Sequence, residues 1–295
     1  MSWDAVVVNY NGGAHLMACV GALRDTARVG NTPRIVVVDN GSTDGSDADC
    51  ERTFGVSVLR PGRNLGYGRA ANLGIAATRA PVVAVCNPDT MLDAAGVEVV
   101  AERFALEQEL GALGPRIENV DGTVYPSART IPAFGDAVGH AVLGLVWPEN
   151  PSTRRYRQLD ADPAVPRDVD WVSGAAIWLR RAALDDVGGW DERYFMYVED
   201  VDLCERLRGR GWRVGYEPRV RVVHVQGVST DRHPYRMIAQ HHRSLARYAA
   251  DHWHGPRRLL LVPAVVLLAA RAGAAMAAHA ARGRMPRSET AGVAR

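Results

Sequence analysis

The sequence of 295 residues contains no lysine, and all 35 of its basic residues are arginine. The 33 acidic residues nearly balance them, which leaves a formal net charge of +2. So small a positive surplus gives no indication of nucleic-acid binding. The missing lysine also argues against a sugar nucleotidyltransferase, because that class of enzyme needs a catalytic lysine beside a glycine-rich loop.

Cysteines are few and widely spaced, at positions 19, 50, 86 and 204. No two of them form a CxxC pair, which argues against a zinc cluster or a disulfide framework. Residues 1–5 contain no basic segment that leads into an apolar stretch, so no secretory signal is predicted. These features together predict a protein of the reducing cytoplasm.

Apolar residues make up 47% of the chain, enough to bury the core of one large domain or two small ones. In the first 117 residues, short β-branched runs alternate with helical patterns. Strands are predicted at Ala5–Val8, Arg34–Val38, Val56–Leu59, Val82–Val85 and Ala112–Leu113, and helices at His15–Val29 and Tyr67–Thr78. This alternation predicts an α/β fold with a doubly wound, mostly parallel sheet.

The second half of the chain has a less regular pattern. Trp147–Asp168 contains four prolines and many charges, which favours a mobile loop or linker. Beyond it we expect a strand over Trp171–Leu179, a turn at Gly188-Gly189, a helix from about Val201 to Arg210, and strands near Val214 and over Val220–Val225.

Polar residues follow three of the predicted strands. Asn9-Tyr10-Asn11, Asp39-Asn40-Gly41-Ser42 and Asn87-Pro88-Asp89 each come directly after a buried run. In open α/β sheets, ligands bind beyond the carboxyl ends of the strands. We therefore expect these segments to converge on one crevice.

Asp39 is the candidate for a hydrogen bond to a base or ribose, since a carboxylate after a buried strand can accept one. The alternative is that Asp39-Asn40-Gly41-Ser42 is only a turn. The segment 61–72 opens a helix, and its glycines, with Arg63 and Arg69, favour a diphosphate. Asn64 or Asn72 could equally be a helix cap.

Asp89 is the candidate ligand for a hard divalent cation that bridges a diphosphate, with His224 as a second ligand. A lone histidine is more often structural.

Glu199 and Asp200 form a pair of adjacent acids. Asp202 and Glu205 have the spacing of a capping box, so we expect the helix to begin at Asp202 and the pair to face outward just before it. The pair is then a candidate general base, and the alternative is a solvated acidic surface.

Taken together, these segments resemble the family 2 glycosyltransferases with the GT-A fold, over about residues 3 to 250. Four motifs in order carry the resemblance: Val8-Asn9-Tyr10-Asn11, Val38-Asp39-Asn40-Gly41-Ser42-Thr43-Asp44, Asn87-Pro88-Asp89, and Gly189-Trp190-Asp191 with Glu199-Asp200-Val201-Asp202-Leu203. Within that family the chain is similar to the dTDP-rhamnose-dependent rhamnosyltransferases of actinobacterial cell-wall synthesis.

The resemblance implies an inverting transfer of L-rhamnose from dTDP-L-rhamnose to a polyprenyl-diphosphate-linked N-acetylglucosamine, with Mg²⁺ or Mn²⁺. It implies a nucleotide-sugar half (residues 1–117), an acceptor-binding and catalytic half (118–255) and a membrane-associating tail (256–295). The implied catalytic residues are Asp200, as the base, and Glu199. The other implied contacts are Asn9, Tyr10, Asn11, Asp39, Asn40, Ser42, Asn64, Gly66, Arg69 and Asn87 for the nucleotide sugar, Gly174, Trp190 and Asp191 for the acceptor, and Asp89 and His224 for the cation. Asn87 replaces the first acid of the family's Asp-X-Asp motif, which removes one charge from the cation site.

The tail contains a twelve-residue apolar run, Leu259–Ala270, followed by Arg271 and an alanine-rich stretch. Because a spanning helix needs about 20 apolar residues, the run favours a helix that lies in the membrane interface. Arginines between Glu205 and Arg258 favour an anionic inner leaflet, so we expect peripheral association with the cytoplasmic face of the membrane. The alternative is a core helix.

Two other functions stay open. One is the transfer of a different sugar, or transfer to a different acceptor, since sugar choice depends on a few pocket contacts. The other is an inactive, membrane-bound scaffold, which the intact acids at Asp39, Asp89 and Asp200 disfavour.

Overall fold

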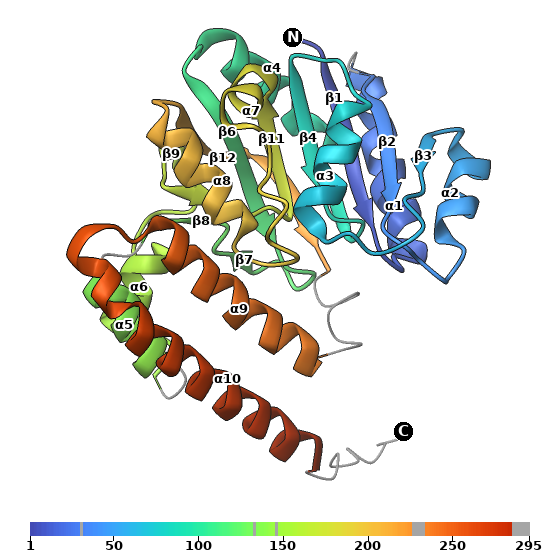
Figure 1. Cartoon of the computed structure of the whole chain (residues 1–295). Helices are drawn as coiled ribbons and strands as arrows, with labels where there is room; N and C mark the ends of the chain where they lie inside the picture. Colours follow the sequence, from blue (N-terminus) through green and yellow to red (C-terminus); the bar gives the residue numbers. More distant parts are fainter. Residues whose placement is uncertain (30–31, 132–133, 145–146, 226–233, 285–295) are drawn as a thin grey trace, which may run out of the picture. The chain divides into compact units, whose positions relative to one another are not determined.

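A computed structural model describes the chain except for residues 30–31, 132–133, 145–146, 226–233 and 285–295 (Figure 1). The chain forms two compact units, residues 1–232 and residues 233–295. All the candidate site residues named above belong to the first unit.

Four parallel strands form the N-terminal part of the large sheet. Their order is β3 (Ser57–Leu59), β2 (Arg34–Asp39), β1 (Trp3–Asn9) and β4 (Val82–Cys86). In the register of the sheet, Val7 of β1 lies between Val37 of β2 and Cys86 of β4. All seven residues of β1 are buried, as expected of a strand with helices on both faces. The predicted parallel sheet is confirmed here.

The remainder of the sheet is mixed. β11 (Ala176–Arg180) is antiparallel to both of its neighbours, β4 and β6 (Leu110–Glu118). β12 (Arg213–His224) runs parallel to β6, and β5 (Thr90–Leu92) pairs antiparallel with the end of β12. The predicted strand at Ala112–Leu113 therefore lies within β6, but β11 separates it from the four parallel strands.

Helices cover both faces of the sheet (Figure 1). Their bounds are α1 (Ala14–Asp25), α2 (Ser46–Phe54), α3 (Tyr67–Ala76), α4 (Val97–Leu106), α7 (Arg181–Val187) and α8 (Glu199–Gly209). One apolar cluster joins Val6 and Val36 to α3 and α8, and the other joins Val7 and Val37 to α1 and α4. Successive strand residues alternate between the two clusters, because side chains alternate across a strand.

The segment Trp147–Asp168 is not a linker, so that prediction is wrong. It contains α6 (Pro151–Arg157) and ends in β9 (Arg167–Asp168), which pairs with β12. Asn150 caps α6 by accepting a hydrogen bond from the Thr153 N–H at 3.0 Å, and its side chain is fully buried. Pro151 occupies the first turn, where its missing N–H costs nothing.

Two short strands beside this segment pair with each other. The predicted strand over Trp171–Leu179 is divided into β10 (Trp171–Val172) and β11, with a turn between them. β10 pairs antiparallel with β8 (Ala128–Arg129), so that Trp171 lies opposite Arg129. β7 (Val124–Tyr125) pairs with β6, and α5 spans Phe134–Leu143.

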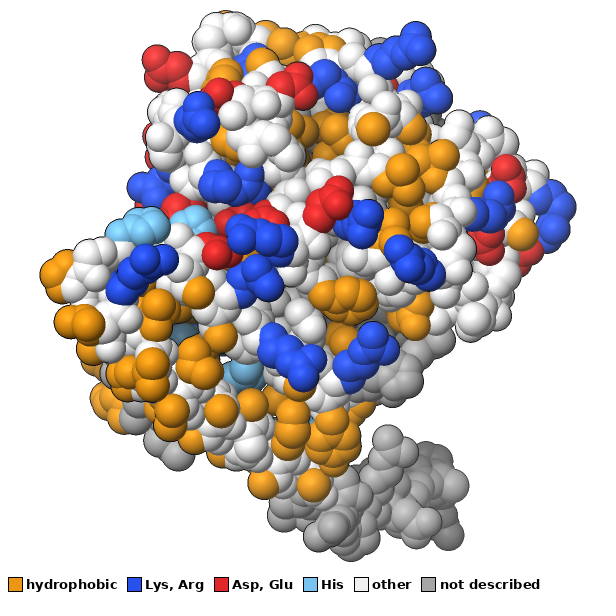
Figure 2. Space-filling view, viewed as in Figure 1, with side chains coloured by type: hydrophobic (Ala, Val, Ile, Leu, Met, Phe, Trp, Pro, Cys, Tyr) orange, Lys and Arg blue, Asp and Glu red, His pale blue; other side chains and the backbone are white. Residues whose placement is uncertain are grey.

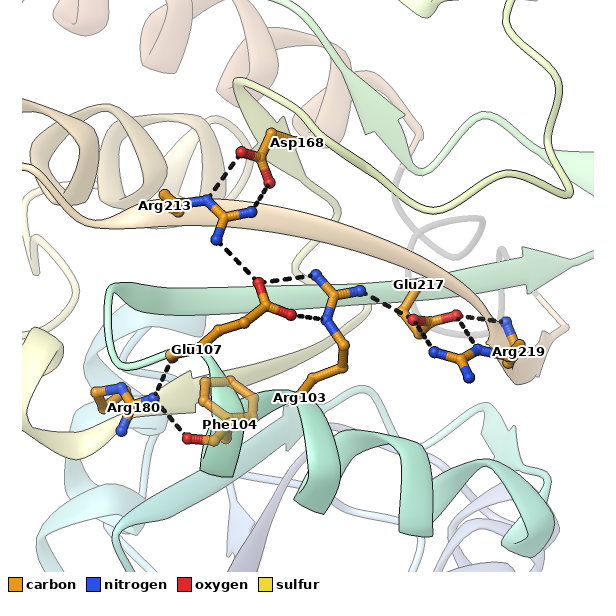
Figure 3. A network of polar contacts seen from close by, with 8 residues as sticks. All are labelled: Arg103, Phe104, Glu107, Asp168, Arg180, Arg213, Glu217 and Arg219. Carbon is orange, nitrogen blue, oxygen red and sulfur yellow. Dashed lines mark hydrogen bonds and ion pairs between the residues drawn. The ribbon is translucent and has the colours of Figure 1, made fainter.

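A chain of ion pairs joins α4 to β12 and β9 (Figure 3). The carboxylate of Glu217 is fully buried and accepts hydrogen bonds from Arg103 at 2.9 Å and from Arg219 at 2.9 Å. Arg213 bridges Glu107 and Asp168 with hydrogen bonds of 2.8 to 2.9 Å. Burial raises the pKa of Glu217, but hydrogen bonds from Arg219 and Arg103 outweigh it and keep the carboxylate charged. The network thereby ties α4 to the long strand β12, at whose end His224 lies.

The second unit consists of α9 (Pro234–His252), a 3₁₀ turn (Gly255–Leu260) and α10 (Leu261–Arg284). α10 continues without a break through Arg271. Leu259, Val262 and Val266 are 83%, 75% and 64% exposed, and apolar side chains gather along this unit in Figure 2. By length and composition alone, Gly255–Ala280 could cross a membrane.

Candidate functional site

Asn9 organises the carboxyl ends of β1 and β2. Its side chain is fully buried, and its Nδ2 donates to Asp39 Oδ1 at 3.0 Å and to Ser42 Oγ at 3.1 Å. Asp39 Oδ2 also accepts from the Ser42 N–H at 3.1 Å. Both oxygens of Asp39 are thereby fixed at the end of β2, with the side chain of Asn9 behind them.

The segment that follows β1 is pinned to the one that follows β2. The Asn11 N–H donates to Ser42 Oγ at 2.8 Å, and Asn11 Oδ1 accepts from the Thr43 N–H at 2.8 Å. A Cβ at Gly12 would lie 2.5 Å from Asn9 Oδ1 and 3.0 Å from Pro88 Cβ. The ends of β1, β2 and β4 therefore meet, as the sequence predicted.

Asn40, Asn64 and Gly66 hold the glycine-rich segment against this edge. Asn40 Nδ2 donates to Asn64 Oδ1 at 3.1 Å, and Asn40 Oδ1 accepts from the Leu65 N–H at 2.7 Å. The N-cap of α3 is Gly66, without a side-chain cap, so neither Asn64 nor Asn72 caps the helix. Arg69, in the first turn, forms a half-exposed ion pair with Glu192 at 3.2 Å.

Asp89 and His224 are brought together by strand pairing. His224, the last residue of β12, lies opposite Thr90 of β5, and the Val225 N–H donates to the carbonyl of Asp89 at 3.0 Å. His224 Nε2 then lies 3.2 Å from Asp89 Oδ1 and 3.5 Å from Asn87 Nδ2. The three side chains converge at the tip of β4.

The Asp89–His224 spacing fits two ligands of one cation. Ligands bound at about 2.1 Å and at right angles lie about 3 Å apart. A carboxylate oxygen and an imidazole nitrogen both suit Mn²⁺. Mg²⁺ binds the carboxylate oxygen more readily than the imidazole nitrogen. No third His, Cys, Asp or Glu completes a cluster in the described residues, so further ligands would have to come from a diphosphate and water.

Glu199 and Asp200 begin α8 instead of preceding it. The capping-box interpretation of Asp202 is wrong, because Asp202 lies inside the first turn and accepts from Arg206 Nε at 2.8 Å. The outward orientation is also wrong, because Glu199 is only 6% exposed and Asp200 is partly buried. The acids are not a solvated surface.

The backbone before α8 explains this orientation. Tyr197 and Val198 both have left-handed conformations, with φ of 67° and 70°. Such a conformation is costly for a β-branched residue, and strain of this kind clusters at functional sites. Two left-handed residues in succession turn the chain sharply, which sends the first acids of α8 into the interior.

The two carboxyl groups have different surroundings, which act differently on their pKa values. Burial raises the pKa of Glu199 to about 8, and the adjacent Asp200 charge adds to the rise. Burial raises the pKa of Asp200 as well, but hydrogen bonds from the N–H groups of Gly174 and Val201, both 2.9 Å, oppose it. Burial therefore favours the protonated form of Glu199 near neutral pH, and the two N–H groups favour the charged form of Asp200.

Gly174 and Trp190 lie against Asp200. A Cβ at Gly174 would lie 3.3 Å from Asp200 Cβ and 3.4 Å from the far edge of the Trp190 ring. Trp190 is almost completely buried, so its indole packs behind the site. Asp191 forms an ion pair with Arg193, whose hydrogen bonds lower the pKa of Asp191 against the opposing effect of burial.

Tyr67 and Asn72 of α3 join the two sides of the site, and the sequence did not single them out for this role. Tyr67 Oη donates to the carbonyl of Gly174 at 2.6 Å, and the Tyr67 N–H donates to the carbonyl of Phe195 at 2.9 Å. The Asn72 amide forms two 2.9 Å hydrogen bonds to the backbone of Trp190. Their position on the buried face of α3 was the available signal.

Backbone hydrogen bonds connect the strand ends that carry Asp39 and Asp89 to the acid pair Glu199 and Asp200. Asn87 donates from its backbone N–H to the carbonyl of Ala175 at 2.9 Å, and the adjacent Gly174 N–H binds Asp200. Asp39, Asp89 and Asp200 thus lie along one edge of the sheet, linked through Asn9, Pro88 and Gly174. This arrangement can hold a nucleotide diphosphate at one end and a hydroxyl group beside a carboxylate at the other.

Comparison with known sequences identifies the family. Residues 4–188, which contain the parallel strands and β11, match Glycosyl transferase family 2. The chain belongs to this family. The resemblance inferred from its four motifs is therefore confirmed, and the protein is a glycosyltransferase.

Two known rhamnosyltransferases are similar to this glycosyltransferase. It is 39% identical over 272 residues to the N-acetylglucosaminyl-diphospho-decaprenol L-rhamnosyltransferase of Mycobacterium tuberculosis, with 87% of this chain and 88% of that protein covered. It is 31% identical over 124 residues to the rhamnosyltransferase WbbL of Escherichia coli, with 42% and 44% covered.

Solved structures confirm the GT-A-like fold. The mannosyltransferase of Pyrobaculum calidifontis, solved with GDP-Man and Mn²⁺, matches with a TM-score of 0.55 and 16% identity over 96% of this chain and 76% of that one. GalNAc-T7, solved with UDP, GalNAc and Mn²⁺, matches with a TM-score of 0.57 and 17% identity over 76% and 43%.

Proposed function

We propose that this glycosyltransferase moves L-rhamnose from dTDP-L-rhamnose to a polyprenyl-diphosphate-linked N-acetylglucosamine. The observation that carries the proposal is the inward-facing pair Glu199 and Asp200, at the end of the edge that begins with Asp39. Backbone N–H groups of Gly174 and Val201 hold the Asp200 carboxyl group in place. The 39% identity to a rhamnosyltransferase with this acceptor in its name supports the choice of sugar and acceptor.

The donor end supports a pyrimidine nucleotide. Asp39 presents oxygens oriented by Asn9 and Ser42, and these can accept a hydrogen bond from a base N–H. Tyr10, Asn11, Asn40, Asn64, Gly66 and Asn87 then shape or line the nucleotide-sugar side, as the sequence suggested. Because Asn9 is fully buried, we assign it a positioning role behind Asp39.

The acceptor end supports a single inverting displacement. Asp200 takes the proton from the attacking hydroxyl group as the oxygen bonds to the anomeric carbon and the nucleoside diphosphate leaves. Glu199 keeps its own proton, and so adds no second charge beside the base. Asp191 lies on the side proposed for the acceptor, and Gly174 and Trp190 pack behind Asp200 and shape that side. Arg69, in the first turn of α3, is proposed to neutralise the charge of the departing diphosphate.

Asp89 and His224 would hold a divalent cation, Mg²⁺ or Mn²⁺. Their 3.2 Å spacing supports this assignment, and so does the presence of Mn²⁺ in the two solved glycosyltransferases described above. When bound, such a cation neutralises the negative charge of a departing diphosphate. Asn87 contributes an amide beside the pair in place of a second carboxylate.

The second unit is proposed to associate with the cytoplasmic face of the membrane. Its exposed Leu259, Val262 and Val266 support insertion into the interface. Arg271 lies only about 5 Å along the helix from the centre of Gly255–Ala280 at 1.5 Å per residue, where a charge is costly in a bilayer, and this favours a helix lying in the interface.

Flotation with vesicles of anionic phospholipid tests the membrane proposal. The full chain should float, and the triple variant Leu259→Asp, Val262→Asp, Val266→Asp should remain at the bottom of the gradient. Leu106→Asp is the matched control, because Leu106 is an equally exposed apolar residue (75%) in the first unit. Equal flotation of the wild type and the triple variant would contradict a membrane role for the second unit.

The transfer itself is tested with radiolabelled donors and a short polyprenyl-diphosphate-GlcNAc acceptor. The expected result is labelled lipid from dTDP-L-rhamnose, and little or none from UDP-glucose, UDP-GlcNAc or GDP-mannose. Labelled lipid from a UDP- or GDP-sugar, with none from dTDP-L-rhamnose, would show that the proposed donor is wrong. No transfer from any donor by folded protein would favour a scaffold.

A further inference from the structure

Arg129 of β8 lies in a cage of aromatic side chains. Its guanidinium carbon is 5.4 Å from the ring centre of Tyr125, 5.5 Å from that of Tyr156 and 4.8 Å from that of Trp171. Cations stack on such rings, and the attraction grows as water is excluded. Three rings around one guanidinium fix its position closely.

The hydrogen bonds of Arg129 leave its charge without a counter-ion. Its Nε donates to the carbonyl of Pro126 at 2.7 Å, and its two terminal nitrogens donate to the hydroxyl oxygens of Tyr125 at 2.8 Å and Tyr156 at 3.4 Å. All of these acceptors are neutral. In the described part of the chain, no carboxylate forms an ion pair with Arg129, which is unusual for a partly buried arginine.

Strand pairing places Arg129 on the strand next to the backbone segment that leads to Asp200. Arg129 of β8 lies opposite Trp171 of β10, and the Ser173 N–H donates to the carbonyl of Ser127 at 2.8 Å. The next residue, Gly174, donates its N–H to Asp200 at 2.9 Å. The same short sheet therefore holds the cation and the backbone donor that serve this carboxylate.

We propose that Arg129 is a positioning residue of the transfer reaction, whose caged guanidinium keeps Asp200 in the anionic form that a general base needs. This rests on the proposed role of Asp200. The Arg129 charge opposes the rise that burial causes in the pKa of Asp200. The effect acts through space, without a direct ion pair that would take the carboxylate away from its substrate.

The other groups that face Asp200 do not replace this charge. Glu199, its neighbour on α8, is protonated near neutral pH. Tyr67 of α3 is a neutral phenol, because burial raises its pKa well above its usual value. Cys204, one turn along α8, is a thiol whose pKa burial raises to about 12. Among these groups, Arg129 carries the positive charge that lowers the pKa of Asp200.

The pH dependence of transfer tests the proposal. In Arg129→Met, the acidic limb of kcat/KM should move upward by about 1 pH unit, the size expected of a unit charge several ångströms away in a partly buried site. In Arg129→Lys, which keeps the positive charge, the acidic limb of kcat/KM should lie at the same pH as in the wild type. Arg167→Met is the matched control, because Arg167 also stacks on a tyrosine, 4.7 Å from the Tyr216 ring, and donates only to neutral oxygens.

An unmoved acidic limb in Arg129→Met would overturn the proposal. A higher KM for the lipid acceptor with an unmoved limb would instead make Arg129 an acceptor contact, which also overturns it. A merely structural role would lower the rate without moving the limb and without rescue by lysine.

Unfolding free energies give a readout that needs no turnover. Two double-mutant cycles combine Asp200→Asn with Arg129→Met or with Arg129→Lys. In the Arg129→Met cycle, the coupling energy between the two positions should be largest at pH 8 and decline as the pH falls, because protonation of Asp200 removes the charge that Arg129 attracts. The Lys variants should keep near-wild-type stability over the same pH range. Coupling that is absent or independent of pH would contradict the assignment, whatever becomes of the proposed transfer activity.

Discussion

Replacement of Glu199 by glutamine should stabilise the protein in alkaline solution. The folded-state pKa of Glu199 is about 8, well above the ordinary 4.5, because its carboxyl group is buried beside Asp200. The folded state therefore binds the proton more tightly than the unfolded state does. Stability is fully retained below the unfolded-state pKa, and it falls as the pH rises toward 8, where Glu199 must ionise in the interior.

The magnitude follows from the size of the pKa shift. From pH 6 up to the folded-state pKa of about 8, the wild type loses about 1.4 kcal/mol of unfolding free energy for each pH unit, and the loss levels off above that pKa. The gap in unfolding free energy between Glu199→Gln and wild type should therefore grow by about 3 kcal/mol in favour of the variant over this range. Asparagine at position 200 would reduce the gap, because the Asp200 charge contributes to the shift.

Urea unfolding monitored by tryptophan fluorescence at pH 6, 7.5 and 9 measures this gap. Glu118→Gln is the matched control. Arg221 and Arg116 hold the pKa of Glu118 below its usual value, so the cost of that substitution should stay constant from pH 6 to 9. A Glu199→Gln gap that is also constant over this range would refute the protonated state of Glu199 and the assignment of roles built on it.

Two further predictions concern the cation and the backbone. Asp89→Asn should weaken Mn²⁺-dependent binding of dTDP-L-rhamnose by at least tenfold in calorimetry while metal-free binding changes little; equal loss with and without Mn²⁺ would remove Asp89 from the cation site. Gly66→Ala should destabilise the fold by on the order of 2 to 4 kcal/mol, because φ is +88° and the new Cβ would lie 2.5 Å from a backbone carbonyl oxygen. Gly62→Ala, at φ +76° with nothing within 4 Å, should cost only about 1 kcal/mol, and equal costs would contradict the close packing at Gly66.

The sequence predicts the parallel part of the sheet well. β1, β2 and β4 are continuous apolar runs of the kind that only doubly covered strands require, and the polar residues directly after them lie together as expected. The pairing of Asp89 with His224 was also anticipated, although the two residues lie far apart in the chain. The sequence did not predict the position of β11, because its antiparallel insertion between β4 and β6 depends on long-range pairing that leaves no local pattern.

Two errors have local physical causes. The four prolines of Trp147–Asp168 obscured a proper helix-start signal, since Asn150-Pro151 is a favoured N-cap and first-turn pair. At α8 the capping-box pattern of Asp202 and Glu205 suggested a later start. The left-handed backbone at Tyr197 and Val198 has no signature in these residue types, so the sequence could not reveal that Glu199 and Asp200 are turned inward.

Single-turnover transfer by Glu199→Gln and Asp200→Asn tests the division of labour between the two acids most directly. With radiolabelled dTDP-L-rhamnose and the polyprenyl-diphosphate-GlcNAc acceptor in excess, Asp200→Asn should lose at least a thousandfold in rate while still binding the donor. Glu199→Gln should retain transfer within about tenfold of wild type at pH 7, because glutamine mimics the protonated acid. The opposite pattern, with transfer retained by Asp200→Asn and lost in Glu199→Gln, would contradict the account.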